Sequence, residues 1–283
     1  MKNQAIVDFM IIGAQKSATT TLFDILKTHP ELAACKKKEP EFFSHTKNWK
    51  EKVDTYHALY TKQKGQLAFE ATTAYTAHPF HNANLREDLW AYNPKLKLIY
   101  IVRDPIDRIV SAHRFLYRMG YAKKKNINLN VKSSNYHILL SQYYYQIKPY
   151  IDRFGAENIK ILLFEDFIKS PKNTVNTILE FLKVQPLENF VNIKSNTKSR
   201  KIMQKVGFSR ITRWYLKAKK HLPYRVSEAL KKRLMYRDIA ESDLIFTNKT
   251  LQQLENELMP DIEKFEQLID RDLSHWKLKF KQQ

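Results

Sequence analysis

The stretch Asp8 to Leu22, DFMIIGAQKSATTTL, decides the fold of this 283-residue chain. Its apolar start, residues 9–12, predicts a buried strand, and Gly13 permits a tight exit from that strand. A predicted helix follows, and the free N–H groups at its start, together with the ammonium of Lys16, form a cradle for an anion. We therefore expect a phosphate-like group above the strand end, although an ordinary strand, turn and helix would share this outline.

The spacing of Gly13 and Lys16 separates this stretch from two common nucleotide-binding motifs. The phosphate loop of nucleoside triphosphatases needs a second Gly directly before the Lys, and the dinucleotide fingerprint needs G-x-G-x-x-G. Here the Lys follows the only Gly of the stretch by three residues. The spacing argues against both motifs, and a Mg²⁺-dependent, kinase-like phosphotransferase stays as the second enzyme hypothesis.

A second stretch, Lys97 to Ser111 (KLIYIVRDPIDRIVS), repeats the strand-to-helix pattern. Asp104 is placed to cap the helix, and Pro105 suits its first turn. The guanidinium of Arg103, just past the strand, and the hydroxyl of Ser111 are suited to hold a second phosphate. Taken alone, Arg103 and Asp104 would be interpreted as a local ion pair. Two anion sites at strand ends together favour a ligand with two phosphate-like groups.

Both stretches, in this order, resemble the nucleotide-binding motifs of sulfotransferases that use 3′-phosphoadenosine-5′-phosphosulfate (PAPS). QKSATTT from Gln15 is similar to the family's loop for the 5′-phosphosulfate, and IVRDP from Ile101 with Ser111 to its site for the 3′-phosphate. Further similar segments, which extend the resemblance over nearly the whole chain, are Glu39 to Phe43 (EPEFF), Phe69 to Tyr75 (FEATTAY), Ile159 to Phe167 (IKILLFEDF) and Asp272 to Trp276 (DLSHW). The EPEFF block resembles the heparan sulfate N- and O-sulfotransferase branch and its bacterial relatives.

The resemblance implies PAPS as the donor, adenosine 3′,5′-bisphosphate as the product, and a set of residues that bind them. The implied nucleotide-binding residues are Lys16, Ser17, Ala18, Thr19, Thr20, Thr21, Arg103, Ser111, Arg200 and Lys201. Lys16 is also expected to stabilise the negative charge that develops on the bridging oxygen. The resemblance assigns Glu39 as the base that takes the acceptor's proton. Glu70 and His45 are further candidates for binding the acceptor.

The surroundings of Glu39 allow a second interpretation. Pro40 disfavours a helical backbone at the residue before it, so Glu39 is expected in an extended turn. An exposed carboxylate paired with a neighbouring lysine is the alternative. Two positions depart from the family pattern: Ala18 stands where Gly is usual, and Ala71 stands where heparan sulfate enzymes carry a Lys. The second departure argues against a heparan-type acceptor.

Composition favours a single soluble enzyme. With 43% hydrophobic residues the chain can bury one large core, and its one cysteine, Cys35, excludes an intramolecular disulfide. The nine histidines form no ligand pattern such as H-E-x-x-H, so the sequence calls for no metal. The first strand begins without a charged-then-apolar leader, and no apolar run reaches about 20 residues. We therefore expect a cytoplasmic protein.

The net charge of +20 is concentrated late in the chain. From Lys194 to Arg237 there are fifteen Lys or Arg and one acidic residue, Glu228. This basic stretch is consistent with a groove for an anionic acceptor, a surface for peripheral contact with anionic lipid, a nucleic-acid face or a plain solvated face. We expect a small-molecule or oligosaccharide acceptor and no nucleic-acid partner. A basic polymer- or membrane-binding module is the alternative outside the enzymes.

The order of predicted elements indicates an α/β fold. A single three-layer, P-loop-like domain over residues 1–283 is expected, with a central parallel sheet flanked by helices. The expected strands are 9–12, 67–70, 98–102 and 159–164. The expected helices are 20–28, 106–119, 136–154, 174–182 and 249–269. Residues 196–242, basic and weakly periodic, are expected to form a helical insertion or flap.

Overall fold

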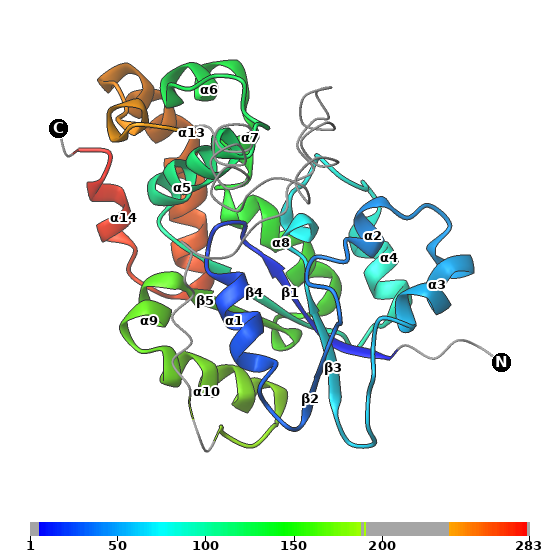
Figure 1. The fold of residues 1–283 in the computed structure, drawn as a ribbon. Helices are drawn as coiled ribbons and strands as arrows, with labels where there is room; N and C mark the ends of the chain where they lie inside the picture. The colour runs from blue at the N-terminus through cyan, green and yellow to red at the C-terminus, as the bar shows by residue number, and fades with distance from the viewer. Residues whose placement is uncertain (1–5, 188–189, 191–237, 282–283) are drawn as a thin grey trace, which may run out of the picture.

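Five parallel strands form one sheet in the order β2-β3-β1-β4-β5 (Figure 1). The computed structural model describes residues 6–187, 190 and 238–281. The strands are β1 (Val7–Gly13), β2 (Leu32–Ala34), β3 (Leu67–Ala71), β4 (Lys97–Val102) and β5 (Ile159–Leu163). The predicted α/β fold, a parallel sheet flanked by helices, is confirmed. The four predicted strands correspond to β1, β3, β4 and β5, whereas β2 is too short to show an alternating pattern.

Helices connect the strands and complete the carboxyl-terminal part. The α-helices are α1 (Thr19–Leu26), α2 (Phe42–His45), α3 (Trp49–His57), α4 (Leu85–Tyr92), α5 (Pro105–Arg118), α6 (Ile127–Ser133), α7 (Tyr136–Leu139), α8 (Tyr143–Phe154), α9 (Phe164–Lys169), α10 (Pro171–Leu182), α13 (Asn248–Ile269) and α14 (Ser274–Leu278). Within the described residues, the 3₁₀ turns are η1 (Thr73–Thr76), η2 (Ala156–Asn158) and η4 (Glu241–Leu244). The predicted helices 20–28, 106–119, 174–182 and 249–269 correspond to α1, α5, α10 and α13.

Side chains of β1 alternate between the two faces of the sheet. Phe9 and Ile11 pack into one apolar cluster, Met10 and Ile12 pack into the other, and all four are fully buried. A strand buried on both faces reads as a continuous apolar run, as residues 9–12 do. Helices α1, α9 and α10 cover the first face, and α4, α8 and α13 cover the second (Figure 1).

The structure corrects the single helix predicted over 136–154. Two helices, α7 and α8, occupy this range, and Ser141 is buried between them. Arg108 of α5 donates from Nε to Ser141 Oγ (2.7 Å) and from Nη2 to the carbonyl of His137 (2.5 Å). The carboxylate of Asp261 accepts from two backbone N–H groups at the start of α8 (3.0 and 2.8 Å). Side chains of other elements thus satisfy backbone groups that a continuous helix would have paired.

The strand order places two loops at one crevice. The chain leaves β1 toward β2 and β3 on one side, and leaves β4 toward β5 on the other. Ligands of open parallel sheets bind at this kind of switch point, outside the carboxyl ends of the strands. The loop after β1, residues 14–18, and the turn after β4, residues 103–104, border the crevice. Most of the predicted insertion at 196–242 lies outside the described residues, as does the whole basic stretch, residues 194–237.

Candidate functional site

The loop between β1 and α1 turns sharply over the end of its strand. A Cβ added to Gly13 would come within 2.0 Å of Thr76 Oγ1, so only Gly fits the exit from β1. Lys16 and Ala18 both adopt left-handed backbone conformations, with φ of 73° and 62°. Ala18 is the N-cap of α1, and no side chain caps this helix. The first amides of α1 are therefore available to an anion.

Replacement of Ala18 by Gly is expected to stabilise the fold. An L-residue in the left-handed region costs roughly 1 kcal/mol, which Gly does not incur. Thermal unfolding of Ala18→Gly should therefore show a higher midpoint than the unchanged protein, with Ala14→Gly, outside this region of the backbone, as the matched control. An equal or lower midpoint for Ala18→Gly would contradict the assigned backbone conformation.

Lys16 and Arg103 meet at the crevice. Arg103 Nη1 donates a long hydrogen bond to the carbonyl of Lys16 (3.5 Å), and Lys16 Nζ lies 4.4 Å from the ring centroid of Phe115. Burial, then the charges of Arg103 and Lys38, lower the pKa of Lys16 to about 8. No ion pair joins Lys16 to a carboxylate within the described part of the chain. Lys16 and Arg103 thus bring two positive charges close together, and an anionic ligand would be bound favourably there.

Ser111 lies on the same face of α5 as Asp107 and Phe115, which contact Arg103 and Lys16. Asp107 accepts from Arg103 Nη2 (3.2 Å), and Phe115 contacts Lys16. Residues 107, 111 and 115 follow one another at intervals of four, so they lie in one row along the helix. Ser111 is thus placed between the arginine and the lysine, as a shared site requires.

Buried polar atoms of both crevice loops lack hydrogen-bond partners among the described residues. The acceptors are Gln15 Oε1 and Asp104 Oδ2, of which the second lies 3.6 Å from Lys279 Nζ, and the donors are Ser17 Oγ and Arg103 Nε. Ser17 is fully buried, and Arg103 lies over the Phe164 ring at 4.6 Å. Because buried polar groups are normally satisfied, the two donors fit a bound ligand with phosphate-like oxygens.

Asp104 fixes the turn that carries Arg103. Its Oδ1 accepts from the backbone N–H of Asp107 (3.0 Å), which confirms the predicted N-cap, and Pro105 begins α5. Glu165 accepts from the backbone N–H of Asp104 (2.9 Å). Burial raises the pKa of Asp104 to about 6. Lys279, which sequence reasoning missed, reaches Asp107 Oδ1 (2.7 Å) from beyond α14.

Glu39 is held against the end of β3. Its backbone N–H donates to the carbonyl of Ala71 (2.9 Å), and its Oε2 accepts from the backbone N–H of Thr73 (2.8 Å). Lys38 Nζ pairs with Oε1. The φ of Glu39 is 55°, so the expectation of an extended backbone was wrong, since β3 contacts override the preference that Pro40 imposes. Its side chain is 30% exposed and lies outside any helix.

Glu70 sits in the core beneath Glu39. It is fully buried, and its carboxylate accepts hydrogen bonds from Tyr56 (2.6 Å), Tyr75 (2.9 Å) and Thr72 (2.7 Å). Burial, and to a smaller extent the charge of Glu39, raise the pKa of Glu70 to about 7, although the three hydrogen bonds act in the opposite direction. The structure therefore places Glu70 under the segment that anchors Glu39, enclosed by protein groups, and its predicted role toward the acceptor stays a prediction.

The raised pKa of Glu70 has a consequence for stability. Because the folded-state pKa exceeds the ordinary value of 4.5, the fold binds the proton more tightly than the unfolded chain. The stability that the protonated Glu70 contributes to the fold is fully present below pH about 4.5 and is lost as pH rises through about 7. Chemical denaturation should show that Glu70→Gln gains stability relative to the unchanged protein between pH 5 and 8. A difference that is constant with pH would contradict the raised pKa.

His45 is the last residue of α2. It pairs with Glu41 Oε2 (3.4 Å) and lies against His81, with ring centroids 5.0 Å apart. These rings line a cleft of about 790 Å³ between α2, α3 and the segment before α4. None of the loop residues 14–18 or 103–104 lines this cleft.

The structure thus gathers part of the predicted site. The loop residues Lys16 to Thr21 lie with Arg103 and Ser111 around one crevice, while Arg200 and Lys201 lie outside the described residues. Sequence reasoning missed Arg108, which is fully buried although its Nη1 has no partner among the described groups. A lone arginine in a helix carries no signal of such burial.

The described residues contain neither a metal-ligand cluster nor a helix that could span a membrane. No group of three or more His, Cys, Asp or Glu is placed to hold a metal ion. Among the helices of the described ranges, none has the length and apolar character required to cross a membrane.

Comparisons with known proteins agree with the geometry. The model of the sulfotransferase domain matches residues 7–277. The chain is 36% identical over 110 residues to the membrane-associated sulfotransferase kil1 of Dictyostelium discoideum, covering 38% of this chain and 22% of that protein. It is 24% identical over 186 residues to heparan sulfate glucosamine 3-O-sulfotransferase 3B1 of Mus musculus, covering 61% and 45%. The chain therefore spans less than half the length of these curated relatives.

A solved structure shares the fold. The sulfotransferase from Alicyclobacillus acidocaldarius superimposes with a TM-score of 0.64 and 23% identity, covering 96% of this chain and 98% of the other. At this identity the likeness concerns the fold alone.

Proposed function

The chain belongs to the sulfotransferase domain family, and on this premise we propose that it transfers the sulfonate group of PAPS to a hydroxyl or amine of a carbohydrate or glycosylated acceptor. The observation that carries the proposal is the meeting of Lys16 and Arg103 at one crevice, with no carboxylate ion-paired to Lys16 in the described part. A ligand with phosphate-like groups at two ends, such as PAPS, supplies the missing negative charge.

The residues present fit the two ends of this donor. Lys16, the unpartnered Ser17 hydroxyl and the uncapped first turn of α1 are suited to the 5′-phosphosulfate. Arg103, with an unpartnered Nε, and Ser111 are suited to the 3′-phosphate. The donor supplies an activated sulfonate and a good leaving group, adenosine 3′,5′-bisphosphate.

Lys16 and Glu39 carry the proposed chemistry of the protein. The acceptor attacks sulfur in line, the S–O bond to the nucleotide breaks, and negative charge grows on the departing oxygen. The ammonium of Lys16 stabilises that charge. Glu39 takes the acceptor's proton, and the hydrogen bond from the Thr73 amide holds its carboxylate in place.

The family assignment also ranks the other hypotheses. A kinase-like phosphotransferase would require Mg²⁺ and ATP, and the sulfotransferase match over most of the chain favours sulfonate transfer instead. The relatives include an enzyme named for heparan sulfate glucosamine, which supports a carbohydrate acceptor. Ala71, in place of the lysine of the heparan-type enzymes, favours a different glycan.

Transfer of radiolabelled sulfonate tests the proposal directly. PAPS labelled with ³⁵S, mixed with the protein and a panel of glycosides and amino sugars, should give a labelled product in the absence of divalent metal. Labelled product formed only with ATP and Mg²⁺, from γ-³²P-labelled nucleotide, would contradict it.

Arg103→Ala should weaken binding of adenosine 3′,5′-bisphosphate by about 10- to 100-fold, because a charge-assisted contact contributes about 1.5–3 kcal/mol. Calorimetric titration measures the loss. Adenosine 5′-monophosphate, which lacks the 3′-phosphate, is the matched ligand and should lose much less. An equal loss for both nucleotides would remove Arg103 from the 3′-phosphate site.

A further inference from the structure

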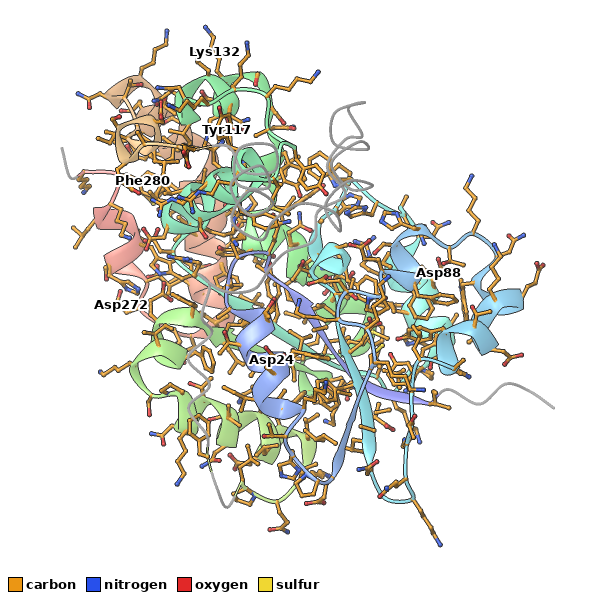
Figure 2. All side chains as sticks on the ribbon, in the orientation of Figure 1. Asp24, Asp88, Tyr117, Lys132, Asp272 and Phe280 are labelled. Atoms are coloured by element: carbon orange, nitrogen blue, oxygen red, sulfur yellow. The ribbon has the colours of Figure 1, made fainter. Side chains whose placement is uncertain are left out.

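A cleft of about 790 Å³ lies at the far end of α2 from Glu39. Helices α2, α3 and α4 lie together beyond β3, and Asp88 of α4 marks this region in Figure 2. Ser44, which lines the cleft, follows Glu39 by five residues through the single turn of α2. An acceptor that presents one hydroxyl to Glu39 therefore has a cleft within reach for its remaining part.

The charges in the cleft cancel. Lys47 and Lys50 are matched by Glu51 and Asp88, although the whole chain carries a net charge of +20. A site for a polyanion needs an excess of cations to bind its charges. This cleft lacks such an excess among its described lining residues, so its occupant need not be charged.

Asp88 is already satisfied by protein groups. Its Oδ1 accepts from Trp49 Nε1 (3.0 Å), and its Oδ2 accepts from the Asn82 amide (2.7 Å). The carboxylate is thereby fixed as part of the wall and is less suited to bind a cationic ligand. Trp49 and Phe80 supply aromatic surface to the lining.

Neutral groups that both donate and accept hydrogen bonds remain for a ligand. The Ser44 hydroxyl is one of them: the residue is only 4% exposed, and its Oγ has no partner among the described groups. His81 is another, because burial and the neighbouring His45 lower its pKa and keep the ring neutral. The exposed amide of Asn84 is a third. Hydroxyl groups of a sugar ring are the natural counterparts, since each also donates and accepts.

We propose that this cleft binds a neutral, polyhydroxylated ring of the acceptor, with its apolar face against aromatic surface and its hydroxyls on Ser44, His81 and Asn84. The inference rests on the proposed function and narrows it: the acceptor is an uncharged glycoside and not a polyanionic glycan.

Ligand-observed NMR titration measures the binding directly. The probes are methyl β-D-glucopyranoside, methyl β-D-galactopyranoside and methyl N-acetyl-β-D-glucosaminide, each added to the protein with adenosine 3′,5′-bisphosphate. At least one should bind saturably, and His81→Ala should weaken that glycoside by about fivefold or more. Asn84→Ala, a change on an exposed loop, should act in the same direction. His275→Ala, an exposed histidine of α14, is the matched control and should leave binding unchanged.

Three results would overturn the inference: no saturable binding of any probe, equal binding by the His81→Ala and His275→Ala variants, or tight binding of N-desulfated heparin that is lost in His81→Ala. Calorimetry with adenosine 3′,5′-bisphosphate keeps the two proposals apart. If the protein binds a glycoside but does not bind adenosine 3′,5′-bisphosphate, the proposed function is overturned and the sugar cleft stands. If the protein binds the nucleotide but none of the glycosides, the sugar cleft is overturned and the proposed function stands.

Discussion

Replacement of Glu39 by Gln should lower turnover by about 10²-fold or more while leaving the affinity for adenosine 3′,5′-bisphosphate nearly unchanged. The amide keeps the shape of the side chain and an oxygen for the Thr73 N–H, but it is unable to take the acceptor's proton. The loss should therefore appear in kcat. Radiolabelled sulfonate transfer at saturating donor and acceptor gives kcat, and calorimetry gives the nucleotide affinity.

Glu41→Gln is the matched control for this variant. Glu41 also has a left-handed backbone, with φ of 56°, but its carboxylate pairs with His45, away from the β3 edge. It should reduce turnover far less than Glu39→Gln. Unaltered turnover in Glu39→Gln, or a larger loss in Glu41→Gln, would remove Glu39 from the mechanism.

Replacement of Lys16 by Met should lower turnover by about 10²- to 10³-fold, as the loss of one preorganised charge-stabilising donor does. Methionine keeps much of the length and the contact with Phe115, so the loss reports the missing charge. Lys27→Met, at the exposed end of α1, is the matched control and should leave turnover unchanged.

The pH profile provides a second measurement on Lys16. Its pKa in the free protein is lowered to about 8, and only the protonated amine carries the charge that the donor needs. Because kcat/KM reports the free enzyme, kcat/KM for PAPS should fall as pH rises through about 8. The residual activity of Lys16→Met should lack this step. A step that persists in Lys16→Met would assign it to another group.

The β1–α1 and β4–α5 units could be predicted from sequence because their signals are local. A doubly buried strand reads as an apolar run, and Asp104 with Pro105 marks a helix start within a few residues. The break between α7 and α8 could not be predicted in this way. It depends on Arg108 and Asp261, which are distant in sequence and reach the backbone only in the folded chain.

The candidate site shows the same difference between residues that belong to local motifs and residues whose contacts form only in the folded chain. Lys16, Arg103 and Ser111 belong to motifs, so the sequence predicted them, and the fold brings them to one crevice. The tyrosine enclosure of Glu70 and the left-handed backbone of Glu39 arise from contacts between α3, β3 and η1. The cleft beyond α2 arises where α2, α3, α4 and the segment before α4 meet. No motif or residue spacing in the sequence predicts those contacts.

Calorimetric titration with adenosine 3′,5′-bisphosphate, in buffer without divalent metal, tests the central assignment most directly. The unchanged protein should bind this nucleotide saturably and at least about tenfold more tightly than ATP, and both Lys16→Met and Arg103→Ala should weaken the binding. Binding of ATP with Mg²⁺, without a response to adenosine 3′,5′-bisphosphate, would contradict the assignment.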